Sequence, residues 1–345
     1  MRRTILALTP LLLLALPGRV EAADPAEVRG AIEKSLPLLQ QGARTFRERS
    51  EGRCIACHHQ GPLQLVVALA RERGFRIDEE LERAELDRIR GFYARRQELY
   101  RRALTDPDAA RQADRFGNFT VHVGYWLSGY AAEGGPSDEA TATAALFLAS
   151  RQAADGHWDF DDTARAPLQA SDFTTTALAV RVLQKYGPKD RAEELAGRID
   201  RAGRWVLRST PRTTDDKVYR LHGLAWTGAA RDEIRTAADT LAAEQRADGG
   251  WAQQENMPSD AYATGLVLVA LHQSGGLDAS SAVYRRGVDY LMTTRMKDGS
   301  WFVRTRAIPS NPYFESGFPH GRSQFISYAG TCHAVMALTL TVERK

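Results

Sequence analysis

One short motif recurs along this chain and restricts its fold more than any other feature. Asp-Gly-x-Trp occurs at residues 155–158, 248–251 and 298–301, and each copy ends a stretch with helical periodicity. Each stretch carries a leucine and, four residues later, a long polar side chain: Leu148 with Gln152, Leu241 with Gln245, and Leu291 with Arg295. Self-similarity at intervals of this size is typical of a chain built from stacked repeats.

The ending of each repeat has a physical interpretation. Glycine can adopt the left-handed conformation that ends a helix, so we expect Gly156, Gly249 and Gly299 to stop the helices that precede them. The tryptophan that follows offers a large apolar surface and one N–H donor for packing against the next repeat. The glutamine can satisfy backbone groups that helix ends leave unpaired.

A second type of helix is expected between these repeats. Six segments are apolar on nearly all sides, which predicts burial all round: 63–73, 118–130, 172–186, 217–226, 260–273 and 325–340. Charged, amphipathic segments such as 26–49, 79–103 and 190–208 alternate with them. The chain is therefore predicted to be all-α. About six inner and six outer helices predict an (α/α)6 toroid, a barrel formed by a single domain over residues 23–345; an open solenoid is the alternative.

The repeats resemble the QW motifs of the squalene–hopene cyclase, oxidosqualene cyclase and protein prenyltransferase superfamily. The first copy lacks the leading basic residue of that pattern, and the second has Thr240 in place of the aromatic residue. The third keeps Arg286, Gly287 and Tyr290 but has Arg295 in place of glutamine. The resemblance covers most of the chain after its N-terminal segment and implies an α/α toroid.

The N-terminus predicts export. Arg2 and Arg3 precede an apolar run from Ile5 to Leu16, and small residues at 20–22 suit a cleavage site, so residues 1–22 are predicted to be a signal peptide. An uncleaved anchor is the alternative. We expect a periplasmic or extracellular protein with no transmembrane anchor after cleavage. Lys and Arg number 46 against 43 Asp and Glu without a basic stripe, which argues against a nucleic-acid partner.

The segment Cys54-Ile55-Ala56-Cys57-His58 is a candidate cofactor site. In an exported protein, C-x-x-C-H is typical of covalent haem c attachment, with both thiols bound to the haem and His58 as the metal ligand on the iron. A Cys54–Cys57 disulfide and a Cys/His metal site remain as alternatives. The chain also resembles exported bacterial proteins that place this segment ahead of cyclase-like repeats. Cys332, in an apolar run, is predicted to be a core residue.

An acidic motif at residues 159–164 is a candidate catalytic site. It spells the Asp-x-Asp-Asp-Thr-Ala motif of squalene–hopene cyclases, and the resemblance implies that Asp161 is a catalytic acid that protonates a terminal alkene. In those enzymes the motif opens an inner helix. Here Pro167 intervenes and the next inner helix begins at Ser171-Asp172, so a solvated acidic loop is the favoured alternative.

Two further catalytic candidates, Asp172 and Asp260, stand at the starts of inner helices, where capping is the alternative role. In the protein prenyltransferases, the same helices carry an Asp, a Cys and a His that bind zinc. Asp260 fits the Asp position, but Tyr262 stands where the Cys would be and Gly330 near where the His would be. The resemblance therefore implies that this zinc site is not retained.

A long loop at residues 302–323 holds the remaining candidates. Tyr313, Phe314, Glu315 and His320 are expected at the mouth of the barrel, and a packed lid without chemistry is the alternative. This loop and residues 159–170 each connect an outer helix to an inner one, so both should lie at one rim. On an inner helix, His222 and Trp226 are candidates to face the cavity, although a buried, satisfied histidine is the favoured interpretation of His222.

These features support functions of different classes. The first is a redox or sensory protein with haem c and an electron-transfer partner. The second is a protein that binds, or a cyclase-related enzyme that converts, an isoprenoid-like small molecule in the barrel. The third is a non-catalytic interaction module. The sequence leaves open whether the protein is an enzyme.

Overall fold

The computed structural model describes residues 23–50, 57–114, 119–160, 165–308 and 313–344, without the side chains of residues 57–59. These residues form helices and loops, and the only β-type pairing among them is an isolated bridge between Arg165 and Gln169. The expectation of an all-α chain is confirmed. The predicted signal peptide lies outside the described residues.

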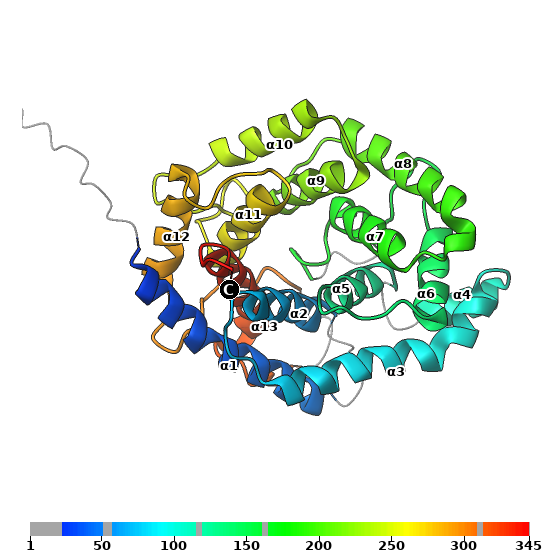
Figure 1. Cartoon of the computed structure of the whole chain (residues 1–345), viewed down its shortest axis with the longest axis horizontal. Helices are drawn as coiled ribbons and strands as arrows, with labels where there is room; N and C mark the ends of the chain where they lie inside the picture. The colour runs from blue at the N-terminus through cyan, green and yellow to red at the C-terminus, as the bar shows by residue number, and fades with distance from the viewer. Residues whose placement is uncertain (1–22, 51–56, 115–118, 161–164, 309–312, 345) are drawn as a thin grey trace, which may run out of the picture.

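The inner helices form a closed ring (Figure 1). Each inner helix packs against the next inner helix along the chain, and the last, α13, packs against the first, α2. Closure excludes the open solenoid for the described part of the chain. The inner helices are α2 (Cys57–Glu72), α5 (Phe119–Ala132), α7 (Asp172–Tyr186), α9 (Thr214–Thr227), α11 (Ala261–Gln273) and α13 (Gln324–Thr339).

An outer ring surrounds the inner one, and the two types of helix alternate along the chain as expected for an α/α toroid (Figure 1). A short helix, α4 (Pro107–Asp114), was not predicted; the Asp106 carboxylate accepts a hydrogen bond from Asp108 N (2.9 Å) where it begins. A 3-10 turn, η1 (Lys189–Arg191), precedes α8. The outer helices are α1 (Pro25–Arg49), α3 (Glu79–Ala103), α6 (Glu139–Ser150), α8 (Ala192–Arg208), α10 (Arg231–Ala243) and α12 (Ala282–Thr294).

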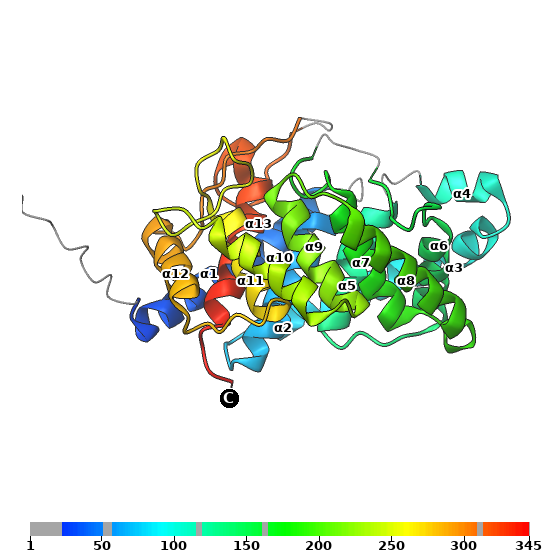
Figure 2. The same ribbon diagram turned by 90° about the horizontal axis from the view of Figure 1, so that it is seen from above.

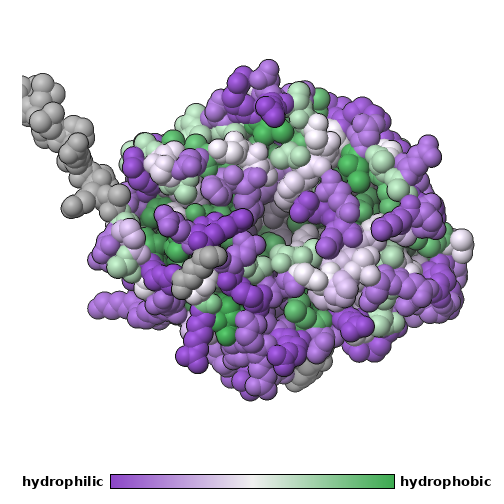
Figure 3. Space-filling view, viewed as in Figure 1, coloured by the Kyte–Doolittle hydropathy of each residue, from purple (hydrophilic) through white to green (hydrophobic). Residues whose placement is uncertain are grey.

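Burial follows the predicted division between the rings. All residues of α11 from Ala261 to Leu271 are buried, whereas α10 buries only Ala237, Ala238 and Leu241. On the face seen in Figure 3, hydrophilic side chains predominate around the perimeter and pale or apolar residues occur nearer the centre. Among the described residues, no helix is both long and apolar enough to cross a bilayer.

The repeat glycines have a different role from the predicted one. Helices α6, α10 and α12 already end at Ser150, Ala243 and Thr294, so the expectation that the glycines stop them was wrong. Gly156, Gly249 and Gly299 instead occupy tight turns further on, with φ of 113°, 85° and 96°. The next outer helix approaches these turns so closely that a Cβ at Gly249 would lie 2.4 Å from Arg286 O. Glycine is therefore required by both conformation and space.

The tryptophans connect each turn to the outer helix that precedes it. Every motif indole is buried and donates to the backbone carbonyl of the leucine ten residues earlier. The backbone N–H of each tryptophan donates to a threonine hydroxyl on the following inner helix. The indole bonds are Trp158 to Leu148 (2.7 Å), Trp251 to Leu241 (2.8 Å) and Trp301 to Leu291 (2.7 Å).

The glutamines join each repeat to the next. The Gln152 side chain donates to Arg198 O on α8 and the Gln245 side chain donates to Val283 O on α12, both at 2.8 Å. The third repeat has no glutamine, and its turn meets the start of the ring instead, where the Ser35 hydroxyl on α1 donates to Gly299 O (2.6 Å). The outer ring is thus closed through the third repeat.

The described parts of the two long loops lie on the same side of the ring, the upper side in Figure 2, as predicted. The later one, residues 302–323, ends in a 3-10 turn, η2 (Gly321–Ser323), directly before α13.

Candidate functional site

A buried carboxyl group marks the most unusual position inside the ring. Asp215 and Asp216 lie in the first turn of α9, which Thr213 caps. Asp216 completes the capping box, because its Oδ2 accepts from Thr213 N (2.9 Å) while Thr213 Oγ1 accepts from Asp216 N (3.2 Å). Asp215 is therefore not needed for capping, and its side chain is buried in the interior, with 2% exposure.

Asp215 belongs to a connected group of side chains from four inner helices. We call Tyr125, Asp215, Tyr219, Tyr262 and His333 the central cluster. The Tyr262 hydroxyl on α11 donates to Asp215 Oδ1 (2.6 Å). His333 on α13 packs edge-on against Tyr262, with ring centres 5.2 Å apart, and Tyr125 on α5 hydrogen-bonds with Tyr219 on α9. Asp215 Oδ2 has no hydrogen-bond partner among the described residues.

Burial controls the protonation of this cluster. Desolvation raises the pKa of Asp215 to about 7, although the Tyr262 hydrogen bond and the charge of Arg306 oppose the rise. Burial also raises the pKa of Tyr262 well above its usual value, so the phenol keeps its proton and remains a donor. Because Oδ1 is the acceptor from Tyr262, the acidic proton of neutral Asp215 belongs on Oδ2. The arrangement is that of a buried acid at neutral pH.

A chain of polar side chains supports the start of α11. Arg306 Nε donates to Gln253 Oε1 (2.7 Å), and Gln253 Nε2 donates to Asp260 Oδ2 (2.8 Å). The other oxygen, Asp260 Oδ1, accepts from Ala263 N (2.9 Å) and caps the helix. Desolvation raises the pKa of Asp260 to about 6. Asp260 thus has both oxygens occupied, unlike Asp215, so its geometry fits the capping alternative.

The other acidic candidates lie at the rim. Asp172 is half-buried at the start of α7, where Ser171 is the capping residue, and its Oδ1 accepts from Phe160 N (3.1 Å). Asp161 lies outside the described residues. Asp159, the first residue of the same motif, is exposed, with 66% of its side chain accessible.

His222 and Trp226 lie towards the other end of α9 from Asp215. Their rings are stacked with centres 4.6 Å apart, and His222 Nδ1 is hydrogen-bonded to the Ser274 hydroxyl (2.7 Å). Desolvation lowers the pKa of His222 to about 3, so the imidazole is neutral. This is the environment of a buried, hydrogen-bonded histidine.

The candidate residues in the late loop, residues 302–323, make contacts that include the outer helix α1 and the third repeat turn. Phe314 packs edge-on against Phe46 of α1, with ring centres 5.1 Å apart. The half-exposed Tyr313 donates to the Glu315 carboxylate. His320 Nε2 is 2.7 Å from the Ser300 hydroxyl in the third repeat turn. These contacts are those of a packed lid, and the structure does not bring these side chains together with Asp215.

The predicted haem motif is described only in part. Cys54 lies outside the described residues. Cys57 and His58 begin α2, but their side chains are also outside the description. Cys332 is fully buried, as predicted for a core residue.

Sequence analysis missed most of the central cluster. The expected inner helix began at residue 217, whereas α9 begins at Thr214, so the prediction excluded Asp215. The available signal was Thr213-Thr214-Asp215-Asp216, two acids at the start of an inner helix when only one can complete the capping box. Tyr262 was a candidate, but its hydrogen bond to Asp215 links two segments that the sequence does not place together.

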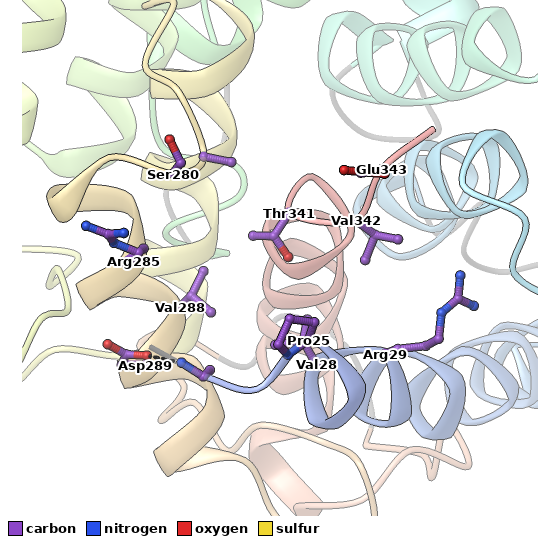
Figure 4. A pocket seen from close by; sticks show the side chains of 12 residues that line it. Pro25, Val28, Arg29, Ser280, Arg285, Val288, Asp289, Thr341, Val342 and Glu343 are labelled. Carbon is purple, nitrogen blue, oxygen red and sulfur yellow. Dashed lines mark hydrogen bonds between the residues drawn. The ribbon is translucent and has the colours of Figure 1, made fainter. Parts of the chain in front are cut away.

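A pocket of about 500 Å³ lies at the edge of the ring, where both ends of the described chain meet α12 (Figure 4). Val28, Val288 and Val342 are among the apolar residues that line it, and Asp289 accepts a hydrogen bond from Ala23 N (3.1 Å) at its edge. The predicted site residues do not line this pocket.

Known proteins resemble this chain over parts of its length. No protein-family model matches it. Squalene–hopene cyclase from Bradyrhizobium diazoefficiens is 34% identical over 125 residues, which cover 30% of this chain and 18% of that enzyme. Lanosterol synthase from Saccharomyces cerevisiae is 31% identical over 86 residues, or 25% of this chain and 12% of that enzyme. The match therefore spans less than a fifth of either relative.

Solved structures agree over nearly the whole chain. The type II terpene cyclase MstE from Scytonema superposes with a TM-score of 0.52 at 14% identity, covering 91% of this chain and 98% of that one. A protein from Actinoplanes gives 0.52 at 16% identity, covering 92% and 100%. The chain therefore has the same α/α-toroid fold as these structures. Asp215 lies in the first turn of the inner helix α9, whereas the acidic motif to which the sequence resemblance assigns the catalytic acid precedes α7.

Proposed function

We propose that this protein binds an isoprenoid ligand inside the ring and protonates one of its carbon–carbon double bonds, with Asp215 as the acid. One observation carries the proposal. Asp215 is a fully buried carboxyl group whose pKa is raised to about 7 and whose Oδ2 lacks a partner among the described residues. A neutral acid with a free O–H directed into a protein interior suits proton donation to a weak base such as an alkene.

The proposed step can be written in terms of the residues present. The Asp215 O–H bond breaks as the alkene π electrons form a new C–H bond, which leaves a carbocation on the ligand and a carboxylate on Asp215. The Tyr262 hydroxyl stabilises that carboxylate through its hydrogen bond. Cation–π contact with Tyr125 and Tyr219 of the central cluster would stabilise this cation. Attack by a further double bond closes a ring, and loss of a proton from the product restores the acid.

The comparisons support the ligand class. Squalene–hopene cyclase is the relative with the longer of the two curated matches. A variant of MstE has been solved with its substrate, geranylgeranyl dihydroxybenzoate, and matches this chain with a TM-score of 0.53 at 13% identity. Both names denote chemistry on polyprenyl chains, and the proposal extends that chemistry to this protein.

Deuterium incorporation tests the proposal. The purified full-length chain is incubated in D₂O with geranylgeranyl dihydroxybenzoate or with squalene, and the products are analysed by mass spectrometry. Cyclised product with one solvent-derived deuterium is expected, since each cycle begins by proton transfer from Asp215.

Three variants locate the acid. Asp215→Asn should abolish the labelled product, whereas Asp172→Asn, in the first turn of α7 but half-exposed, should retain it. Loss of activity in Asp161→Asn but not in Asp215→Asn would assign the acid to the acidic motif instead. Absence of cyclised product from both compounds with the folded wild type would refute the proposed chemistry.

A second candidate function rests on the motif at residues 54–58. We propose that Cys54 and Cys57 attach haem c with His58 as an iron ligand, in a periplasmic or extracellular protein that exchanges electrons with a redox partner. What supports this is the C-x-x-C-H spacing behind a predicted signal peptide. Expression with c-type haem maturation should give a pyridine haemochrome spectrum that Cys54→Ala/Cys57→Ala lacks. A spectrum without haem would leave a disulfide or metal site as the role of this motif.

A further inference from the structure

A cluster of potential metal ligands lies at the rim, apart from the proposed chemistry at Asp215. His157 belongs to the first Asp-Gly-x-Trp turn, Asp159 follows it, and Asp172 begins α7. One ligand atom from each of these three side chains lies within 4.8 Å of the other two. Because bonds to one ion measure about 2.0–2.2 Å from imidazole nitrogen or carboxylate oxygen, the side chains would draw slightly closer together on binding it.

The histidine is oriented for this role. Its Nδ1 lies 2.5 Å from Asp155 Oδ1, and its Nε2 lies 2.7 Å from Asp159 Oδ1. The ring also stacks on Trp205 of α8, with ring centres 5.0 Å apart and planes 16° from parallel. A metal-bound histidine usually donates its other N–H to a carboxylate, which fixes the ring and its tautomer. Asp155 occupies that position, and Nε2 faces the Asp159 carboxylate.

The other repeats show that the turn itself does not require these side chains. The equivalent of His157 is Gly250 in the second repeat and Ser300 in the third. The equivalent of Asp159 is Ala252 in the second repeat and Phe302 in the third. The tryptophan contacts of the turn are the same in all three repeats. The first repeat alone therefore carries a nitrogen ligand and a carboxylate where the shared fold accepts small or apolar residues.

The charge around the histidine also favours a cation. Asp155, Asp159 and Asp172 surround the single imidazole. Among the residues that the structure describes, neither Asp159 nor Asp172 forms an ion pair with an arginine or lysine. An ion would offset the repulsion between these carboxylates.

We propose that His157, Asp159 and Asp172 bind a divalent transition-metal ion of the zinc type, with Asp155 holding the imidazole. One imidazole with two carboxylates favours Zn²⁺ over Mg²⁺ or Ca²⁺, which prefer all-oxygen sites. With three protein ligands and an accessible Asp159, the ion keeps an open coordination position. It would also tie the start of the acidic loop to α7.

Zinc titration of the full-length protein tests this site. The protein is stripped with a chelator and titrated with Zn²⁺ by calorimetry, in a Cys54→Ala/Cys57→Ala background that removes the thiol ligands of the alternative Cys/His site. One equivalent of Zn²⁺ is expected to bind and to raise Tm, whereas Mg²⁺ at the same concentration should do neither. A protein that binds no Zn²⁺ equivalent in this background would overturn the proposal.

Variants that copy the other repeats separate binding from folding. His157→Ser and His157→Gly introduce the residues of the third and second repeats, so the turn should fold while the Zn²⁺ equivalent is lost. Asp155→Asn should retain the stoichiometry but weaken binding about 10–100-fold. Asp248→Asn, at the equivalent position of the second repeat, is the matched control and should leave Zn²⁺ affinity unchanged. Unaltered stoichiometry and affinity in both His157 variants would place the ion elsewhere and contradict the assignment.

Discussion

At the scale of single residues, two adjacent aspartates show how environment decides role. Asp216 accepts hydrogen bonds from Arg212 N, Thr213 N and the Ser171 hydroxyl. Asp215 accepts one, from Tyr262, and leaves its second oxygen without a described partner. The first arrangement stabilises a helix end, and the second raises the pKa of a buried carboxyl group. Neighbours in sequence thus have different hydrogen-bonding environments, one that caps a helix and one that favours a protonated acid.

Asp215 should make stability depend on pH. Because its folded pKa of about 7 exceeds its unfolded value, its contribution to the free energy of unfolding is fully present at low pH and is lost as pH rises through about 7. Between pH 5 and 9, the wild type should therefore lose roughly 2–4 kcal/mol more than Asp215→Asn, which cannot ionise. Urea unfolding of both proteins at each pH measures the difference; parallel losses would show that Asp215 does not titrate in this range.

Removing the Tyr262 hydroxyl should affect the acid in a defined way. The hydrogen bond stabilises ionised Asp215, so Tyr262→Phe should raise its pKa and shift the alkaline limb of the kcat profile to higher pH. The rate itself should fall about 10–100-fold, since a bond to a charged group contributes about 1.5–3 kcal/mol.

Tyr284→Phe is the control. The buried Tyr284 hydroxyl donates to Ala337 O (2.9 Å) on α13, whereas Asp215 lies on α9. It should change stability without moving the pH profile. If Tyr262→Phe does not shift the pH dependence of kcat, Tyr262 does not influence the proton-transfer step.

At the scale of elements, the repeat turns depend on contacts between helices. The indole bonds return each turn to its own helix, while Gln152 and Gln245 reach the next outer helix. The sequence reveals the repeat, because the spacing of Leu, Gln, Gly and Trp is local. It does not reveal that the glycine is required by the approach of the next helix, since that contact spans tens of residues.

Two glycines with positive φ allow the cost of backbone strain to be measured separately from the cost of a steric clash. A Cβ at Gly249 (φ 85°) would lie 2.4 Å from Arg286 O, whereas one at Gly228 (φ 75°) would meet nothing within 4 Å. Gly228→Ala should cost about 1–2 kcal/mol through backbone strain alone. Gly249→Ala should cost more, roughly 3–5 kcal/mol, because α12 must also move. Equal losses in denaturant unfolding would show that the close approach carries little energy.

The candidate site was less predictable than the fold, for a physical reason. Helix alternation depends on local apolar patterns, and the predicted bounds of α3 and α7 match the structure. The burial of Asp215 arises only when four inner helices meet, and the adjacent capping residues make its segment resemble an ordinary helix start. The acidic motif at 159–164 was conspicuous in the sequence, but its first residue is exposed at the rim.

At the scale of the whole molecule, both the inner and the outer ring of helices are closed. Helix α13 packs on α2 in the inner ring, and the third repeat turn meets α1 through Ser35 in the outer ring. Closure brings Tyr125, Tyr262 and His333, which come from distant parts of the chain, into one cluster with Asp215. The interior acid therefore depends on a ring that an open solenoid would not provide.

Closure should make the toroid unfold as one unit. Gly299 (φ 96°) lies at the junction, where a Cβ would be 3.3 Å from backbone atoms of Lys34. Gly299→Ala should therefore reduce hydrogen-exchange protection in α7, opposite the junction, as much as in α1 and α13. Protection lost only in α1 and α13 would indicate that the ring behaves as an open array of repeats.

The most direct test of the central claim is the protonation state of Asp215 itself. Infrared difference spectra between wild type and Asp215→Asn, recorded from pH 5 to 9, isolate the carbonyl stretch of this one carboxyl group. We predict a neutral carboxylic acid band at pH 5 that converts to a carboxylate band around pH 7. A carboxylate band throughout the range would mean that Asp215 carries no proton to donate, and would contradict the account.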